Sequence, residues 1–286
     1  MNTTYEAVTA HLVKALEGGV VPWRKSWVDA SPPSNAVSNR PYRGINLFLL
    51  GLGMFRDHRW LSFKQAQQLR GHVRSGEKSM IAVFWKRLEV KRVDEVTGDV
   101  TDAEIPFLRF YHVFNVEQCD GLQLPALPTP NRATEVLRIE RAEKLLETFP
   151  SPPKLRYGDS PWYQPDDDLI QIPPAESFHS TDAFYATLYH EYGHATGHET
   201  RLARKGVTGQ IRFGSETYGQ EELVAELTSA FCCSVAGLDN SLLYSSASYI
   251  QGWLKVLKGD PKMVVIAAAQ AQKAADYIQG LPFEAA

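Results

Sequence analysis

The sequence lacks the features of a secreted or membrane protein. None of its apolar runs reaches the roughly 20 residues that a membrane helix needs, and its first residues show no signal-peptide pattern. It has 3 cysteines, and this odd number in apolar surroundings argues against a disulfide framework and favours a reducing compartment. We therefore expect a cytoplasmic protein with no membrane partner.

The sequence also lacks internal repeats, long low-complexity tracts and any helix suited to reading the major groove of duplex DNA. A repeat protein and a sequence-specific reader of duplex DNA are therefore not expected. In contrast, 44% of the 286 residues are hydrophobic, and this length and composition allow two domains with substantial cores.

Positive charge is concentrated in one half of the chain. Residues 1–92 hold 15 Lys and Arg against 6 Asp and Glu, a balance of +9. The remaining 194 residues hold 15 against 27, a balance of −12. Two halves of opposite sign suggest two roles, and the basic half is a candidate for binding a polyanion.

A proline-rich segment separates the two halves. Three prolines within residues 123–131 predict an extended, semi-rigid linker with no room for a helix. We therefore predict an α+β protein of two domains. Residues 1–122 form an α+β domain, and residues 132–286 form a mainly helical domain with a small sheet.

Periodicity and turn signals predict the elements of each half. The first half is expected to contain helices over 5–16, 43–54 and 62–69 and strands over 80–87, 89–94, 100–103 and 107–115. The second half is expected to contain a strand over 168–172 and helices over 132–149, 182–194, 220–231, 241–257 and 261–279.

One short pattern indicates a metal site. His190-Glu191-Tyr192-Gly193-His194 places two imidazoles at i and i+4 on one helix face, about 6 Å apart between their Cβ atoms. Two such side chains can share an ion, and Glu191 can reach a water on that ion as a general base. The alternative is a surface helix that carries two unrelated histidines.

A third ligand would favour the metal site, because zinc hydrolases usually supply three protein ligands. In one protease family the third ligand is a His six residues after the second His. In this chain the sixth residue after His194 is Thr200, which does not fit that pattern. The other common source is a Glu on a later helix, and residues 220–231 provide such a helix.

That helix carries three carboxylates. Glu222 and Glu226 share a face, whereas Glu221 is turned roughly 100° away. We predict that Glu222 is the third ligand and that Glu226 bonds the free nitrogen of His190 or His194. Glu221 is expected to be solvated. The alternative is a charged helix face with no metal.

Residues 21–92 interleave positively charged and aromatic side chains, the combination that a protein needs to bind single-stranded nucleic acid. The alternative is that the aromatics are core and the charges a solvated face. Trp60, Phe63 and Phe84 are expected in the core. The candidate nucleic-acid contacts are Trp23, Arg24, Lys25, Trp27, Arg40, Tyr42, Arg43, Lys64, Arg74, Lys78, Trp85 and Lys86.

These residues together resemble the ArdC-type antirestriction proteins, which are plasmid-borne and whose N-terminal domain also begins some plasmid primases. The matching segments are VPWRKSW at 21–27, PYRGIN at 41–46, FKQA at 63–66, GEK at 76–78, VFWK at 83–86, VFNVEQCDGL at 113–122, YATLYHE at 185–191, GHETRL at 197–202, EELVAEL at 221–227 and YIQGWL at 249–254. The resemblance implies an N-terminal domain that binds single-stranded DNA and a C-terminal zincin-like metallopeptidase domain. It also implies protection of incoming plasmid DNA from host restriction during conjugation.

The leading hypothesis joins a DNA-binding half to a metallopeptidase half. His190, His194 and Glu222 would hold Zn²⁺, or another divalent ion such as Mn²⁺, and Glu191 would be the catalytic base. The partners would be single-stranded DNA and a protein substrate that pairs with an edge strand at 168–172.

Two alternatives remain open. In the first, the protein coats single-stranded DNA without enzymatic activity and its metal site is structural. In the second, the metal centre cleaves nucleic acid, but one carboxylate ligand and no second metal cluster disfavour it.

Overall fold

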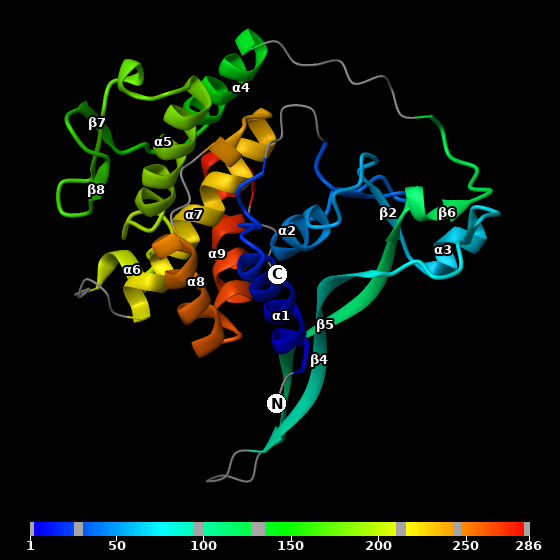
Figure 1. Cartoon of the computed structure of the whole chain (residues 1–286). Coiled ribbons are helices and arrows are strands. Elements are labelled where there is room, and N and C mark those ends of the chain that lie inside the picture. The colour runs from blue at the N-terminus through cyan, green and yellow to red at the C-terminus, as the bar shows by residue number, and fades with distance from the viewer. Residues whose placement is uncertain are drawn as a thin grey trace.

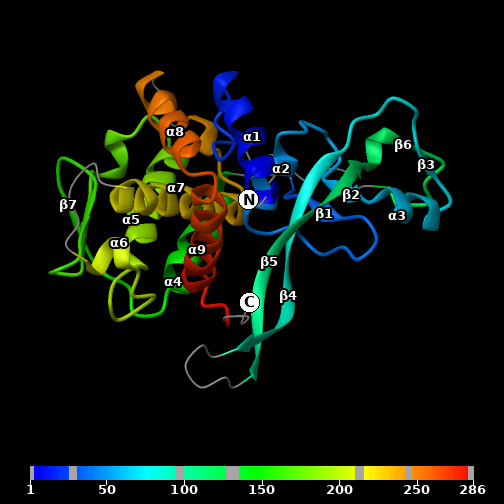
Figure 2. The same cartoon turned by 90° about the horizontal axis from the view of Figure 1, so that it is seen from below.

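The computed structural model describes residues 3–25, 31–93, 100–126, 135–209, 216–242 and 247–282. A helical part and a strand-rich part lie side by side, and a long hairpin extends from the strand-rich part (Figures 1 and 2). Trp27, the segment between the strands predicted at 89–94 and 100–103, and residues 127–131 of the predicted linker lie outside the described ranges.

The predicted helices are present, with ends that differ by a few residues. Ser62 and Gln65 form a capping box at the start of one helix, and the hydroxyl of Ser180 accepts a hydrogen bond from the Ala183 amide at the start of another. The described helices are α1 (Thr3–Glu17), α2 (Ile45–Gly51), α3 (Phe63–Gln68), α4 (Glu135–Glu147), α5 (Thr181–Ala195), α6 (Lys205–Thr208), α7 (Glu216–Ala236), α8 (Ala247–Gly259) and α9 (Met263–Ile278), with 3-10 turns at Val116–Gln118, Ala175–Ser177 and Asn240–Leu242.

The N-terminal half contains a four-stranded sheet in the order β1-β2-β5-β4 and a two-stranded sheet. The strands are β1 (Ser34–Asn35), β2 (Arg59–Leu61), β3 (His72–Val73), β4 (Met80–Val93), β5 (Val100–Asn115) and β6 (Cys119–Asp120).

The hairpin of β4 and β5 is longer than predicted. Each strand is continuous where two short strands were expected, and the antiparallel register runs from Met80 opposite Val113 to Val93 opposite Val100. Pro106 lies inside β5 opposite Arg87, where β4 is the one strand paired with β5 in the described part of the chain and the other edge of β5 needs no amide donor.

A second sheet contains β7 (Lys154–Tyr157), β8 (Trp162–Gln164) and β9 (Leu169–Ile172) in the order β7-β9-β8. β9 is parallel to β7 and antiparallel to β8. The prediction that the strand at 168–172 lies at a sheet edge is therefore wrong, because β9 is central. β7 and β8, which the sequence did not predict, are the edges.

One large hydrophobic core extends across both halves of the chain. Leu12 of α1 and Phe48 of α2 belong to the same buried cluster as Leu223 of α7 and Val264 of α9. The rings of Phe48 and Phe231 stack with centroids 5.0 Å apart. The first two helices therefore pack on the C-terminal helices, while β1, β2, α3 and β6 belong to a smaller peripheral lobe.

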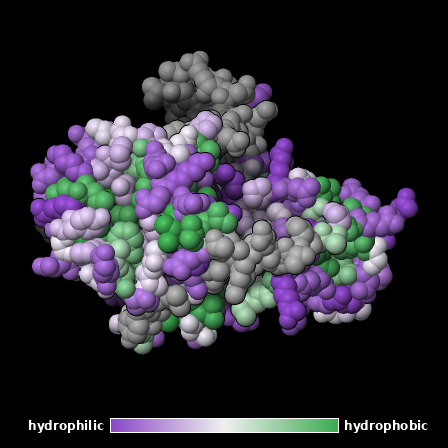
Figure 3. Space-filling view, turned by 90° about the horizontal axis from the view of Figure 1, so that it is seen from above, coloured by the Kyte–Doolittle hydropathy of each residue, from purple (hydrophilic) through white to green (hydrophobic). Residues whose placement is uncertain are grey.

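The predicted two-domain α+β architecture is confirmed, whereas the boundary at 123–131 stays a prediction. Hydrophilic residues cover most of the face seen in Figure 3, and apolar residues form small groups between them. Among the described helices, none is both long enough and apolar enough to cross a membrane.

Candidate metal centre and nucleic-acid surface

Helices α5 and α7 approach each other closely at Gly193. A Cβ atom at this position would lie 3.0 Å from the Cα atom of Ala225, so one of the two backbones would have to move. Glycine inside a helix costs about 1 kcal/mol relative to alanine, and close packing explains its presence here. The contact brings His190 and His194 of α5 next to Glu222 of α7.

The three predicted metal ligands converge on one point. The Nε2 atoms of His190 and His194 are 3.2 Å apart, and each lies 3.6 Å from a carboxylate oxygen of Glu222. Two nitrogens bound to one tetrahedral Zn²⁺ at about 2.0–2.1 Å would be separated by about 3.3 Å. The donor set and its spacing therefore fit a shared divalent ion.

The surrounding carboxylates determine the pKa values of this cluster. Burial lowers the pKa of His190, but the contact with Glu222 and the other nearby carboxylates raise the pKa to about 9. Burial raises the pKa of Glu222, whereas the two histidines bring it down to about 2. Burial also raises the pKa of Glu191, which is 6% exposed. A raised pKa is what a carboxylate needs to act as a general base near neutral pH.

The carboxylate that supports a histidine of this cluster is Glu221, and the prediction of Glu226 is wrong. Oε1 of Glu221 lies 3.4 Å from Nδ1 of His194, on the side of the ring away from His190. Arg204 donates to both oxygens of Glu221 at 2.5 and 3.0 Å, and both side chains are 7% exposed. Glu221 is thus buried in an ion pair, and not solvated as expected.

Glu226 has a different partner. Arg24, a residue predicted to contact nucleic acid, donates to Glu226 at 3.3 Å and its side chain is only 9% exposed. The guanidinium carbon of Arg24 also lies 4.2 Å from the centre of the Tyr249 ring, on α8. Arg24 therefore connects the N-terminal segment to α7 and α8, and the prediction of a DNA contact is wrong for it.

The residues on either side of Arg24 are also bound to the helical part. The indole of Trp23 donates to the Tyr249 hydroxyl at 3.2 Å, and Trp23 is 1% exposed. The amide of Lys25 donates to Asn240, and burial lowers the pKa of the half-buried Lys25 amine. Trp23 is consequently a core residue and is not available for base stacking.

We expect Trp23→Ala to lower the free energy of unfolding by about 3–5 kcal/mol, the usual cost of truncating a buried aromatic side chain. Trp85 is 45% exposed, so Trp85→Ala should cost much less. Urea denaturation of the full chain, followed by circular dichroism, compares the two variants. Equal losses of stability would contradict the placement of Trp23 in the core.

The remaining candidates for nucleic-acid contact lie on the surface of the N-terminal half, except Trp27, which lies outside the described residues, and Tyr42, which is half-buried. Arg43 is ion-paired with Asp276 at 2.5 Å, and Arg74 with Glu77 and Asp120. The exposed candidates that form no ion pair among the described residues are Arg40, Lys64, Lys78, Trp85 and Lys86.

One face of the hairpin carries Phe84, Phe107 and Arg109, which were not among the predicted nucleic-acid contacts, together with Lys86, which was. Phe84, expected in the core, is 42% exposed, and it lies opposite the exposed Arg109. The Arg109 guanidinium carbon is 5.4 Å from the ring centre of Phe107, which lies opposite Lys86. Strand alternation could have grouped these residues, since paired positions point to the same face. Phe63 was also expected in the core and is 52% exposed.

A cleft of about 520 Å³ leads to the metal cluster. Its floor carries His190, Glu191 and Glu222, and Tyr218 lies one turn before Glu222 on α7. Burial and contact with Glu222 raise the pKa of Tyr218 to about 12, so its hydroxyl remains protonated at neutral pH. The other walls are formed by Gly206 and Val207 of α6 and by residues 161–165.

Strand β8 forms one wall of this cleft. Trp162 and Tyr163 line it, and β9 is the only strand paired with β8 among the described residues. Arg201 binds Asp168 through both carboxylate oxygens, and Asp168 accepts a hydrogen bond from Tyr163, which holds the β8–β9 turn in place. An edge strand thus borders the cleft, although it is not the strand predicted.

Two family profiles cover most of the chain. Residues 2–114 match the N-terminal domain of the anti-restriction factor ArdC, and residues 140–270 match a zincin-like metallopeptidase. The chain is also 35% identical over 287 residues to the uncharacterized protein y4eC of Sinorhizobium fredii (strain NBRC 101917 / NGR234), and the match covers 96% of the chain and 91% of that protein.

Three further matches span both domains. A DNA primase TraC of Escherichia coli is 36% identical over 296 residues, which is 98% of this chain but 20% of the primase. The metal-free structure of the antirestriction ArdC protein from the R388 plasmid is 36% identical, with a TM-score of 0.73 and 96% of each chain covered. Its Mn(II)-bound structure has a TM-score of 0.75 at 33% identity, again with 96% of each chain covered.

Proposed function

The chain belongs to the family of ArdC antirestriction proteins, and from this we propose that it binds single-stranded DNA and hydrolyses peptide bonds at a divalent-metal site. We further propose that it acts in the cytoplasm and protects incoming DNA from host restriction during conjugation. The observation that carries the peptidase proposal is the convergence of His190, His194 and Glu222 on the floor of a cleft.

These three side chains would hold the ion, with Zn²⁺ as the proposed metal and Mn²⁺ as the alternative. When bound, such an ion polarises a carbonyl group and lowers the pKa of a coordinated water towards about 7. Glu221 contributes by fixing the His194 ring, because a carboxylate on the second nitrogen orients a ligating imidazole.

We assign proton transfer to Glu191. It is adjacent to His190 in sequence, lines the same cleft and has a raised pKa. It would take a proton from the attacking water and pass it to the leaving amine. The edge strand β8 supports the proposal of an extended protein substrate. Its edge away from β9 pairs with no strand of the described ranges, and a substrate strand laid beside it could form main-chain hydrogen bonds there.

The exposed hairpin face supports the single-stranded DNA proposal. Phe84 and Phe107 offer flat surfaces for unstacked bases, while Arg109 and Lys86 supply positive charge for the backbone. Trp85 lies on the opposite face of the hairpin, because successive residues of a strand alternate between faces, and it is a separate proposed contact. The exposed cations Arg40, Lys64 and Lys78 are further proposed contacts.

We expect the full chain to bind single-stranded DNA more tightly than duplex DNA, with an affinity that falls as salt is added. Phe84→Ala should weaken binding by about 1–3 kcal/mol if one base stacks there. Tyr157→Ala is the matched control, because Tyr157 is an aromatic residue of β7 that is 65% exposed. Fluorescence anisotropy measures the affinity for each form of DNA, its dependence on salt and the affinities of the two variants. Equal affinity for both forms of DNA, or no effect of salt, would refute stacking plus charge as the basis of binding.

The rival function is a binding protein whose metal stabilises the domain and cuts nothing. The buried ion pair of Arg204 and Glu221 beside the metal cluster is the observation that favours it, since such a pair also serves stability. Conjugation into a restricting host separates the two functions. Glu191→Gln should abolish protection if the peptidase is needed and preserve it if the protein only coats DNA.

A further inference from the structure

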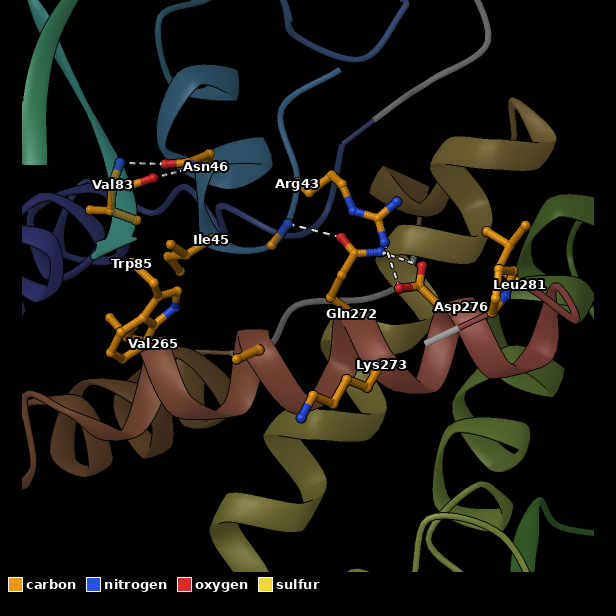
Figure 4. Close-up of a pocket in the computed structure, with 13 residues that line it drawn as sticks. Arg43, Ile45, Asn46, Val83, Trp85, Val265, Gln272, Lys273, Asp276 and Leu281 are labelled. Atoms are coloured by element: carbon orange, nitrogen blue, oxygen red, sulfur yellow. Dashed lines mark hydrogen bonds and ion pairs between the residues drawn. The ribbon is translucent and has the colours of Figure 1, made fainter. Parts of the chain in front are cut away.

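A second cleft, of about 490 Å³, lies between β4 and α9 and contains none of the metal-site residues. Its volume falls within the range of small-ligand sites, about 300–1,000 Å³. Both halves of the chain line it: residues 43–46 and the β4 residues Val83 and Trp85 form one side, and a face of α9 forms the other (Figure 4).

The wall formed by residues 43 and 44 is fastened to α9. Arg43 pairs with Asp276 at 2.5 Å, and the amide of Gly44 donates to Oε1 of Gln272 at 2.9 Å. Figure 4 shows this cluster at one end of the cleft and Trp85 at the other. The cleft is therefore held open by contacts between the two halves and needs no ligand to form it.

The part of α9 that lines the cleft beside Trp85 is apolar. Val265 and Ala269 line it from α9, and the small Ala269 side chain leaves room above the helix. The indole of Trp85 is 45% exposed, although Leu108, its partner across the hairpin, is 1% exposed. A half-exposed indole beside an apolar floor offers a stacking surface to a planar ring.

Two cations lie along the same cleft. Lys273 of α9 is exposed and has no ion-pair partner within the described ranges. The side chain of Arg43 is 52% exposed, and its pairing with Asp276 leaves further N–H donors of the guanidinium unused by that pair. The pairing also offsets the negative charge of Asp276. An aromatic wall with cations beyond it matches a base joined to its phosphate.

We propose that this cleft binds one nucleotide of single-stranded DNA, with its base on Trp85 above Ala269 and its phosphate against Lys273 and Arg43. The inference rests on the proposed DNA binding and extends it to the helical domain. Because α9 packs against α7, which carries Glu222, a strand in this cleft would join the hairpin to the helix that forms the metal site.

Lys273→Gln and Ala269→Met test the proposal in the full chain with a fluorescent oligo-dT. Loss of one phosphate contact should reduce the salt slope of binding by about 0.7 in Lys273→Gln. Lys255→Gln, which removes an exposed charge on α8, should leave it unchanged. Ala269→Met fills the cleft and should weaken binding about 5- to 150-fold, as expected for the loss of one stacked base.

Photochemical crosslinking adds a second measurement, which identifies the residues in contact with the DNA. An oligo-dT that carries 5-iododeoxyuridine should crosslink to Trp85 or to residues 263–278, as identified by mass spectrometry. If the wild-type chain binds no single strand, the proposed DNA binding itself fails. If it binds, but both cleft variants bind like the wild type and crosslinks occur only elsewhere, such as at Phe84, this inference alone is overturned.

Discussion

Glu191→Gln is expected to leave the metal bound and to reduce peptide hydrolysis by about 10²- to 10⁴-fold, the usual contribution of a general base. Glutamine has nearly the same shape as glutamate but cannot accept a proton from water. Glu191 contributes no atom to the cluster of possible ligands, so its replacement should not release the ion. The measurement is the release of peptides from a dye-labelled unfolded protein, alongside metal content determined by mass spectrometry.

Glu199→Gln is the matched control, because Glu199 is an exposed carboxylate shortly after the same helix. It should hydrolyse the substrate at the wild-type rate. A chelator should remove activity from the wild type and from this control. Hydrolysis that survives in Glu191→Gln would contradict the assignment of the base, and a metal-bound wild type that cuts no protein would favour the binding-only alternative.

Glu221→Gln is expected to weaken metal binding by about 10- to 100-fold, since outer carboxylates on ligating histidines contribute this much. It should also lower the free energy of unfolding by about 3–5 kcal/mol, because the buried Arg204 would lose its charged partner. Contacts with His194 and Arg204 outweigh burial and hold the pKa of the Glu221 carboxyl below its usual value. Glu221 is therefore ionised at neutral pH.

Glu226→Gln tests which carboxylate supports a histidine of the metal cluster: Glu221, as in the structure, or Glu226, as predicted from the sequence. Glu226 pairs with Arg24 and, among the described residues, forms no ion pair with His190 or His194, so the replacement of Glu226 should reduce metal affinity less than the replacement of Glu221 does. Metal titration with a competing chelator gives both affinities, at a temperature where circular dichroism shows that each variant is folded. A larger loss for Glu226→Gln would contradict the role given to Glu221.

The metal cluster could be predicted from the sequence because its geometry is mostly local. The spacing of His190 and His194 follows from helical periodicity alone, and Glu222 lies on a later helix whose pattern is also visible in the sequence. Glu221 could not be assigned in this way. Its burial depends on Arg204, which precedes α7 and packs over it, and periodicity does not show which face of a helix is covered.

The substrate edge and the DNA surface depend on long-range pairing, which the sequence does not show directly. The sequence pattern predicts β9 as a strand, but it does not show that β9 pairs with β7 on one side and β8 on the other. Trp23 and Trp85 are both flanked by charge, yet Trp23 is covered by α8 while Trp85 stays half-exposed. Local composition could not separate two residues whose burial is decided by distant helices.

A crystal structure of the full chain grown with Zn²⁺ or Mn²⁺, with the ion located by anomalous scattering, tests the metal centre most directly. We predict one ion about 2.0–2.2 Å from Nε2 of His190, Nε2 of His194 and a carboxylate oxygen of Glu222, with its remaining coordination open to the cleft. An ion bound elsewhere, or a fourth protein side chain that completes its coordination, would contradict a catalytic metal site.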